Sequence, residues 1–336
     1  MMWSSGRFSP LRTLLPVTLF YAVMLTMPYV LPNEYYVSTL TFGCINAIIV
    51  VGLNLLMGFA GQISLGHAAF YGIAAYATGI ATATYGLSMG AGFCIAMLLV
   101  AVVAFAIGIP TLKLTGHYLA MGTLGFGIIV YIFFNESIEL TGGPSGMVGI
   151  PRLALFGHEL WSDTEYFFLV SGVLSLVVLL SLHLIQSRFG RALKAIHTSE
   201  KAAMCMGVDI ARYKLAVFVL SALYAGVAGF LYAHYLGFVA PSSFGFHISV
   251  QLVVMVVLGG MASVWGAVAG AFFLTALPEF LRVFEDIETL VYGAILVLCI
   301  IFMPKGLAGG ATALGQWLRR IVRRICGARD HAGERS

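Results

Sequence analysis

Ten long apolar runs divide the 336-residue chain, separated by short stretches that hold charges, prolines and glycines. A helix needs about 20 residues to cross the roughly 30 Å hydrocarbon layer of a bilayer, so each run predicts a membrane-spanning helix. The expected fold is an all-α polytopic membrane protein with about ten transmembrane helices. The predicted spans are 12–31, 37–57, 67–86, 90–111, 117–135, 165–185, 214–236, 248–264, 265–281 and 289–303.

Two parts of this pattern leave alternatives open. The region 248–281 forms either two short spans or spans with a broken helix around Gly259 and Gly260. The first run follows Arg7 and Arg12, as in a signal peptide, but it continues to Val30 without a small-residue cleavage site, which favours a first span. A membrane β-barrel would need alternating segments of about ten residues, and these runs are continuous.

Charge distribution sets the expected orientation. The chain is 60% hydrophobic and only 10% charged. If the N-terminus is cytoplasmic and the spans alternate, every Lys and Arg except Arg152 and Arg282 falls on the cytoplasmic side, as the positive-inside rule demands. Both termini are then cytoplasmic. The tail 309–336 predicts a basic amphipathic helix lying against membrane lipid, with a solvated basic tail as the alternative.

The sequence offers little chemistry of its own. No Lys, Arg or Asp lies at the centre of a predicted span, so the carboxylate relay of a proton-coupled carrier is missing. The phosphate-binding motif G-x-x-x-x-G-K-[ST] does not occur, and the five cysteines form no C-x-x-C pair. We therefore expect no enzyme activity, no metal, no cofactor bound by this chain and no nucleic-acid partner.

The segment 187–214 differs from the rest, because it holds eight of the 32 charged side chains between two apolar spans. Thr198 or Ser199 can cap a short helix, Gly207 can end it in the left-handed conformation, and Asp209 can cap the next helix. Such a short helix is not stable alone and needs a surface to pack against. A small apolar face is formed by Ala202, Ala203 and Met206. The alternative is a solvated basic loop.

The stretch GFAGQISLGHAAF (58–70) interrupts an apolar region with glycines and polar groups. Irregular backbone at membrane depth is tolerated only where it is buried in protein or lines a cavity. We interpret it as part of a translocation pathway or gate, with helix packing through its glycines as the alternative. The candidate pathway residues are Asn54, Gly58, Gly61, Gln62, Ser64, Gly66 and His67.

A second stretch, GFVAPSSFGFH (237–247), resembles GFAGQISLGH (58–67) but falls on the opposite side in this topology. Transporters often carry inverted repeats with glycine-interrupted helices at matching points. The comparison predicts that spans 2–5 and 7–10 are related by a rotation about an axis in the membrane plane.

Several blocks together resemble the permeases of bacterial branched-chain amino acid ABC transporters. They include FGRALKAI (189–196), GLNLLMGFAGQISLGHAAFYGIAAY (52–76), YLAMGTLGFG (118–127), TGGPSGMVGIP (141–151), VVLGGMASVWGAVAGA (256–271) and PKGL (304–307). The resemblance runs from about residue 40 to 308 and departs from the family at His197, Ile128, Ala262 and Ala267.

The resemblance implies a transmembrane permease domain over 1–308 in the bacterial inner membrane, of the type II ABC importer kind. Its partners would be a homologous second permease, two ABC ATPases that bind ATP and Mg, and a periplasmic substrate-binding protein. The loop 187–213 would be the coupling loop that docks on the ATPase, through Arg188, Gly190, Arg191, Glu200, Ala202, Ala203, Met206 and Gly207. The external loop 136–164 would dock the binding protein, through Gly142, Gly143, Pro144 and Gly146.

The expected function is therefore the uptake of branched-chain amino acids by alternating access, driven by ATP hydrolysis on partner subunits. Within the same class, the alternative is a permease for urea, amides or other amino acids. From other classes, an ion-coupled secondary carrier would need an intramembrane ion site, and an intramembrane protease would need the Ser of GPSG (143–146) within a span.

Overall fold

The computed structural model describes residues 10–30, 33–114, 116–155 and 158–281, together with residues 293, 294, 297, 301, 306, 307 and 309. The predicted span 289–303 and the predicted tail helix in 309–336 lie outside the described residues or nearly so. The long helices are α1 (Pro10–Val30), α2 (Glu34–Asn54), α3 (His67–Gly79), α4 (Met89–Thr111), α5 (His117–Glu136), α7 (Asp163–Gln186), α10 (Ile210–Leu236), α11 (Phe246–Gly259) and α12 (Val264–Leu281).

Each of the first nine predicted spans coincides with one of these helices. Within the described part of the chain, seven helical segments are long and apolar enough to cross a membrane. The predicted end of the span 248–264 is wrong by five residues, because α11 ends at Gly259, and the alternative of a break around Gly259 and Gly260 is confirmed. The break comes after Gly259, because Gly260 has a φ of +113°, which no helix allows.

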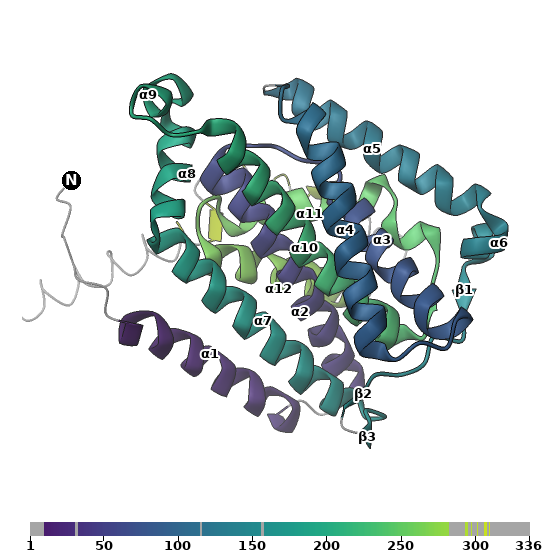
Figure 1. The fold of residues 1–336 in the computed structure, drawn as a ribbon. Helices are drawn as coiled ribbons and strands as arrows, with labels where there is room; N and C mark the ends of the chain where they lie inside the picture. The colour runs from purple at the N-terminus through teal and green to yellow at the C-terminus, as the bar shows by residue number, and fades with distance from the viewer. Residues whose placement is uncertain are drawn as a thin grey trace, which may run out of the picture.

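Two helices form the centre of the bundle (Figure 1). The helix α2 packs against α7, α10, α11 and α12, while α10 also packs against α3 and α4. In the segment Glu34–Phe59, which comprises α2 and its continuation, 83% of the most apolar 18-residue stretch is buried inside the protein. In α5 the buried share of the corresponding stretch is 17%. The helix α5 thus presents most of its surface outward, and α1 lies against α7 at the other side of the bundle.

The central helix α2 is interrupted near its end. It continues into one π-helical turn, η1 (Leu55–Phe59), and then unwinds over residues 60–66 before α3 begins at His67. The interruption needs glycine at position 61, where φ is +68°. Inside the unwound stretch, the backbone amide of Gln62 donates a hydrogen bond to the Leu56 carbonyl at 3.1 Å. The helix α3 ends in a similar turn, η2 (Ile80–Thr84).

The Asn54 side chain connects α2 to the turn between α11 and α12 through two hydrogen bonds. The Asn54 carbonyl oxygen accepts a hydrogen bond from the Ala262 backbone amide at 3.0 Å, and its NH2 group donates to the Ser263 carbonyl at 2.8 Å. Ala262 has a left-handed φ of +62°. Gly259 and Gly270 let α11 and α12 approach backbone to backbone, since a Cβ at either position would collide with the main chain of the facing helix.

The two ends of the bundle carry different small elements (Figure 1). At one end, α8 (Arg188–Thr198) and α9 (Glu200–Cys205) project beyond the long helices. The opposite end holds α6 (Ile138–Thr141), η3 (Gly143–Ser145), β1 (Met147–Val148), β2 (Ala154–Leu155) and β3 (His158–Glu159). There β1 pairs in antiparallel register with β4 (Phe238–Val239), which precedes η4 (Pro241–Phe244).

Candidate functional site

The projecting loop has the capped architecture that its sequence predicts. The Ser199 hydroxyl accepts a hydrogen bond from the Ala202 amide at 3.3 Å at the start of α9. Gly207 is left-handed with a φ of +78°, and the Asp209 carboxylate accepts from the Arg212 amide at 3.2 Å at the start of α10. The described loop is therefore an ordered pair of short helices, as expected for a surface that recognises a partner.

An ion pair holds α9 against the bundle. The Lys214 ammonium lies 2.7 Å from a Glu200 carboxylate oxygen, and the two side chains are 8% and 48% exposed. Lys214 belongs to the first turns of α10, while Glu200 is the first residue of α9. The sequence analysis named Glu200 among the coupling residues but gave Lys214 no role, because a basic residue at the edge of an apolar span is usual.

The predicted apolar face of α9 is only partly correct. Ala203 is 2% exposed and packs inside the loop, whereas Met206 is 84% exposed. A six-residue helix has to bury part of itself to stay folded, and Ala203 serves that purpose. The three predicted residues do not form a raised face but line a hollow of about 330 Å³ between α8 and α9, together with Ala195, Thr198, Ser199 and Val208.

The other predicted coupling residues fall into two groups. Gly190 is buried at the corner between α7 and α8, where a Cβ would collide with the Ile185 backbone, so it shapes the loop and cannot contact a partner. Arg188 and Arg191 are exposed, and the Arg191 guanidinium donates to the Gln186 carbonyl at 3.2 Å. The arginines therefore remain candidates for polar contacts with a partner, and the glycine does not.

The projecting loop and the interrupted part of α2 are in direct contact. A Cβ built on Gly61 would lie 2.8 Å from the Nδ1 of His197, which is on α8. The Lys194 ammonium, also on α8, lies 5.7 Å from the centre of the Phe59 ring in η1. Two regions that the sequence assigned to different tasks, coupling and gating, thus form one continuous structure.

The candidate pathway residues lie in buried contacts. His67 bridges two segments, with Nε2 2.6 Å from the Ser221 hydroxyl on α10 and Nδ1 3.1 Å from the Ser64 hydroxyl. Gly66 and Gly58 are sites of close approach to the backbones of α5 and of the α11–α12 turn. Within the described residues, only Gln62 among this polar set leaves its side-chain nitrogen and oxygen buried and without a hydrogen-bond partner.

The glycines of the opposite end shape a small surface. Gly142, Gly143 and Gly146 all have positive φ, and Gly146 lies against the Val239 backbone where β1 meets β4. Pro144 is exposed between them. Exposed apolar side chains surround this loop, among them Val148 and Trp161. Pro144 and these apolar groups are therefore the exposed part of this end, while the glycines set the path of the backbone.

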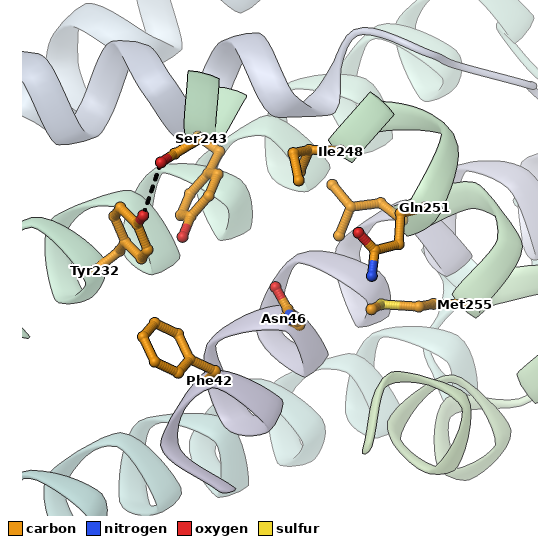
Figure 2. Close-up of a pocket in the computed structure, with 9 residues that line it drawn as sticks. Phe42, Asn46, Tyr232, Ser243, Ile248, Gln251 and Met255 are labelled. Carbon is orange, nitrogen blue, oxygen red and sulfur yellow. Dashed lines mark hydrogen bonds between the residues drawn. The ribbon is translucent and has the colours of Figure 1, made fainter. Parts of the chain in front are cut away.

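A half-open pocket of about 240 Å³ lies between α2, α3, α10, η4 and α11, and sequence reasoning missed it (Figure 2). The Tyr232 hydroxyl donates to the Ser243 hydroxyl at 3.0 Å on one side of it. Its wall is formed by Phe42, Asn46, Tyr71, Tyr232, Ser243, Ile248, Gln251, Leu252 and Met255. None of these side chains is ionisable at neutral pH.

The chain's described residues contain no group of three or more His, Cys, Asp or Glu side chains that could hold a metal ion.

A model of the family "branched-chain amino acid transport system / permease component" matches residues 35–300. The chain belongs to this permease family. The members of this permease family are transporter subunits rather than enzymes, and this permease is accordingly a multi-pass membrane protein.

Individual relatives agree with the family match. The permease is 37% identical over 294 residues to the high-affinity branched-chain amino acid transport system permease protein LivM of Escherichia coli K12, covering 81% of this chain and 69% of LivM. LivH of the same strain is 27% identical over 80% of this chain and 92% of its own length. BraD of Pseudomonas aeruginosa is 27% identical over 82% and 95%. No solved structure matches the permease.

Proposed function

We propose that this permease is the transmembrane subunit of an ATP-driven importer of branched-chain amino acids in the bacterial inner membrane. The relatives LivM, LivH and BraD are all named as permease proteins for these substrates. The permease works by alternating access and performs no chemistry itself. ATP and Mg are bound by separate ATPase subunits, which drive the permease through the loop 187–213.

The observation that carries this proposal is the contact between α8 and the interrupted end of α2. A force applied to the loop by a closing ATPase reaches Phe59 and Gly61 through Lys194 and His197. From there it reaches the α11–α12 turn, because Asn54, the residue directly before η1, hydrogen-bonds to that turn. A packed and hydrogen-bonded chain of this kind transmits a displacement, whereas a solvated loop would not.

The proposed topology has about ten spans with both termini in the cytoplasm, on the side of α8 and α9. The inverted repeat stays a prediction. It is supported by the placement of two glycine-led helix starts. The helix α3 begins after Gly66 and α11 begins after Gly245, and the two starts meet inside the bundle, where the Ala68 backbone amide donates to the Ser249 hydroxyl at 3.4 Å.

The proposed complex contains a homologous second permease, two ABC ATPases and a periplasmic binding protein. LivM and LivH carry separate names as permeases of one transport system in one organism, and this chain resembles both. The lightly buried helices α4 and α5 leave apolar surface for lipid or for the second permease. Pro144, Val148 and Trp161 are proposed to face the binding protein.

Co-purification tests the assembly. The tagged permease is extracted gently from its native membrane, and the proteins that remain bound are identified and quantified by mass spectrometry. The proposal predicts a second permease and ATPase subunits in stoichiometric amounts. A chain that is purified alone and still transports in liposomes without ATP would establish a secondary carrier instead.

A pair of tryptophan variants tests the docking surface. Ala202→Trp fills the hollow between α8 and α9, so we expect at least a tenfold loss of uptake and a weakened hold on the ATPase. Met204→Trp adds the same bulk to the same helix at an exposed position outside the hollow and serves as the control. Equal uptake in the two variants would argue against docking through the hollow. Ala203→Trp is unsuitable, because that side chain is buried and the loop itself would be disrupted.

A further inference from the structure

We propose that the half-open pocket between α2, α10 and α11 is a transit site in which this permease itself binds the transported amino acid, as a zwitterion with an aliphatic side chain. This inference rests on the proposed function and adds the place, the contacts and a size selectivity that belong to the permease. The pocket is shown in Figure 2.

The pocket is built by two helix faces with regular spacing. Phe42 and Asn46 are four residues apart and share one face of α2. On α11, the lining residues Ile248, Gln251, Leu252 and Met255 follow at intervals of three, one and three residues, which is one helical face. Both faces are turned toward each other across the pocket (Figure 2).

The position of the pocket suits a transported substrate. Asn46 lies at the middle of the apolar segment Glu34–Phe59, which places the pocket near the centre of the bundle along the membrane normal. Ser243 belongs to η4, the irregular segment that separates α10 from α11. Transporters place substrate near the membrane midplane and next to interrupted helices of this kind.

The chemistry of the wall favours a net-neutral but dipolar ligand. A ligand with a single net charge would require a counter-charge at this depth, and the wall has none. Side-chain amides can accept from an ammonium group and donate to a carboxylate, so Asn46 and Gln251 serve both ends of a zwitterion. The Asn46 NH2 group is held by the Thr275 hydroxyl at 3.0 Å, which leaves its carbonyl oxygen for the ligand.

Gln251 is the most informative of these groups. The side-chain amide of Gln251 points into the pocket beside Asn46 (Figure 2), and no hydrogen bond joins it to another described residue. The apolar part of the wall is formed by Phe42, Ile248 and Met255 and accommodates a hydrocarbon side chain. Such a mixed and uncharged wall binds weakly, as a transit site must so that the substrate can leave.

The volume of the pocket matches this ligand class. An engineered cavity of about 150 Å³ in another protein holds benzene. In proportion, the 240 Å³ pocket accommodates roughly nine or ten non-hydrogen atoms, which is the size of leucine. In the segment 54–67, by contrast, the side chains of Asn54, Ser64 and His67 already hydrogen-bond to neighbouring groups.

The test changes the size of the pocket in both directions and measures selectivity. The assembled complex with its binding protein takes up radiolabelled leucine and valine, which differ by one methylene group. Ile248→Phe reduces the pocket, so the ratio of leucine to valine uptake is expected to fall about fivefold. Ile248→Ala enlarges it, and the ratio is expected to rise. Val250→Phe adds the same ring to α11 away from the pocket and should leave the ratio unchanged.

The ratio separates selectivity from damage, because misfolding or lost coupling lowers both uptake rates together. If Ile248→Phe fails to assemble, Ile248→Ala and Gln251→Met still test the site. Gln251→Met is expected to raise the KM for uptake of both leucine and valine at least fivefold. Ratios within twofold of wild type in both Ile248 variants, with an unchanged KM in Gln251→Met, would overturn the proposal. A wild-type complex that takes up neither amino acid would instead refute the proposed function and with it this ligand.

Discussion

The ion pair between Glu200 and Lys214 gives the sharpest test of how the projecting loop is held. Glu200→Ala removes the carboxylate and leaves the ammonium group of Lys214, only 8% exposed, without its partner. At 2.7 Å, two unit charges attract by about 6 kcal/mol at an effective dielectric constant of about 20, before desolvation is counted.

The net effect is smaller, because Glu200 is half exposed and water replaces part of the lost attraction. Breaking a fully buried pair costs about 3–5 kcal/mol, and an exposed pair is worth about 0–1 kcal/mol. We therefore expect α9 to lose about 2 kcal/mol of local stability. The equilibrium for opening of the loop then rises about 30-fold.

Limited proteolysis of the purified permease measures this opening. Trypsin cleavage after Lys201 in α9 is followed by mass spectrometry under conditions where the loop recloses faster than it is cut, so the rate reports the open population. The matched control is the double variant Glu200→Ala, Lys214→Met, which has the same sequence around the cleavage site but no unpaired charge. We expect cleavage about 30-fold faster in the single variant than in the wild-type permease, and a rate close to that of the wild type in the double variant. Equal rates in the single variant and the wild type would refute the claim that this ion pair anchors α9.

Two further predictions concern the interrupted end of α2 and the turn that it holds. Ala262→Gly is expected to raise the midpoint of thermal unfolding by about 1–2 °C, because glycine adopts the left-handed φ without the strain that alanine bears. The control Ala267→Gly, in the buried part of α12, should lower the midpoint. A lower midpoint in both variants would contradict the reasoning. Gln62→Met is expected to raise the midpoint of thermal unfolding, because it removes a buried side-chain amide that has no hydrogen-bond partner. It is also expected to lower amino acid uptake, since we expect that amide to form hydrogen bonds in another conformation of the transport cycle. Unchanged uptake would show that the amide has no role in transport.

The sequence predicted local features well wherever one residue type has one physical reason to be present. The apolar runs, the left-handed Gly207 and the capping Asp209 were predicted from the chain and are confirmed, and Ser199 is the cap of the two candidates Thr198 and Ser199. Each depends on hydrogen-bonding capacity, backbone freedom or hydrophobicity, which are properties of the residue itself.

The sequence failed wherever the answer depends on which distant segments meet. Ala203 is as small and apolar as Ala202, and only the packing of α9 makes one buried and the other exposed. The pocket combines Asn46 and Gln251, which are separated by most of the chain and look like ordinary polar residues in apolar helices. In the polar stretch 58–67, Ser64 and His67 proved to hold segments together through hydrogen bonds, while the buried Gln62 side chain has no hydrogen-bond partner among the described residues.

The helix α2 and its continuation η1 take part in three separate contacts, which affects how substrate preference can diverge between related permeases. Phe42 and Asn46 line the pocket, Asn54 holds the α11–α12 turn, and Phe59 in η1 contacts α8. A substitution in α2 that alters the fit of a substrate therefore also disturbs the route by which energy arrives. The lining residues of α11 carry no such double duty, so new specificities are most readily reached by replacing Ile248, Gln251 and Met255 while α2 is kept.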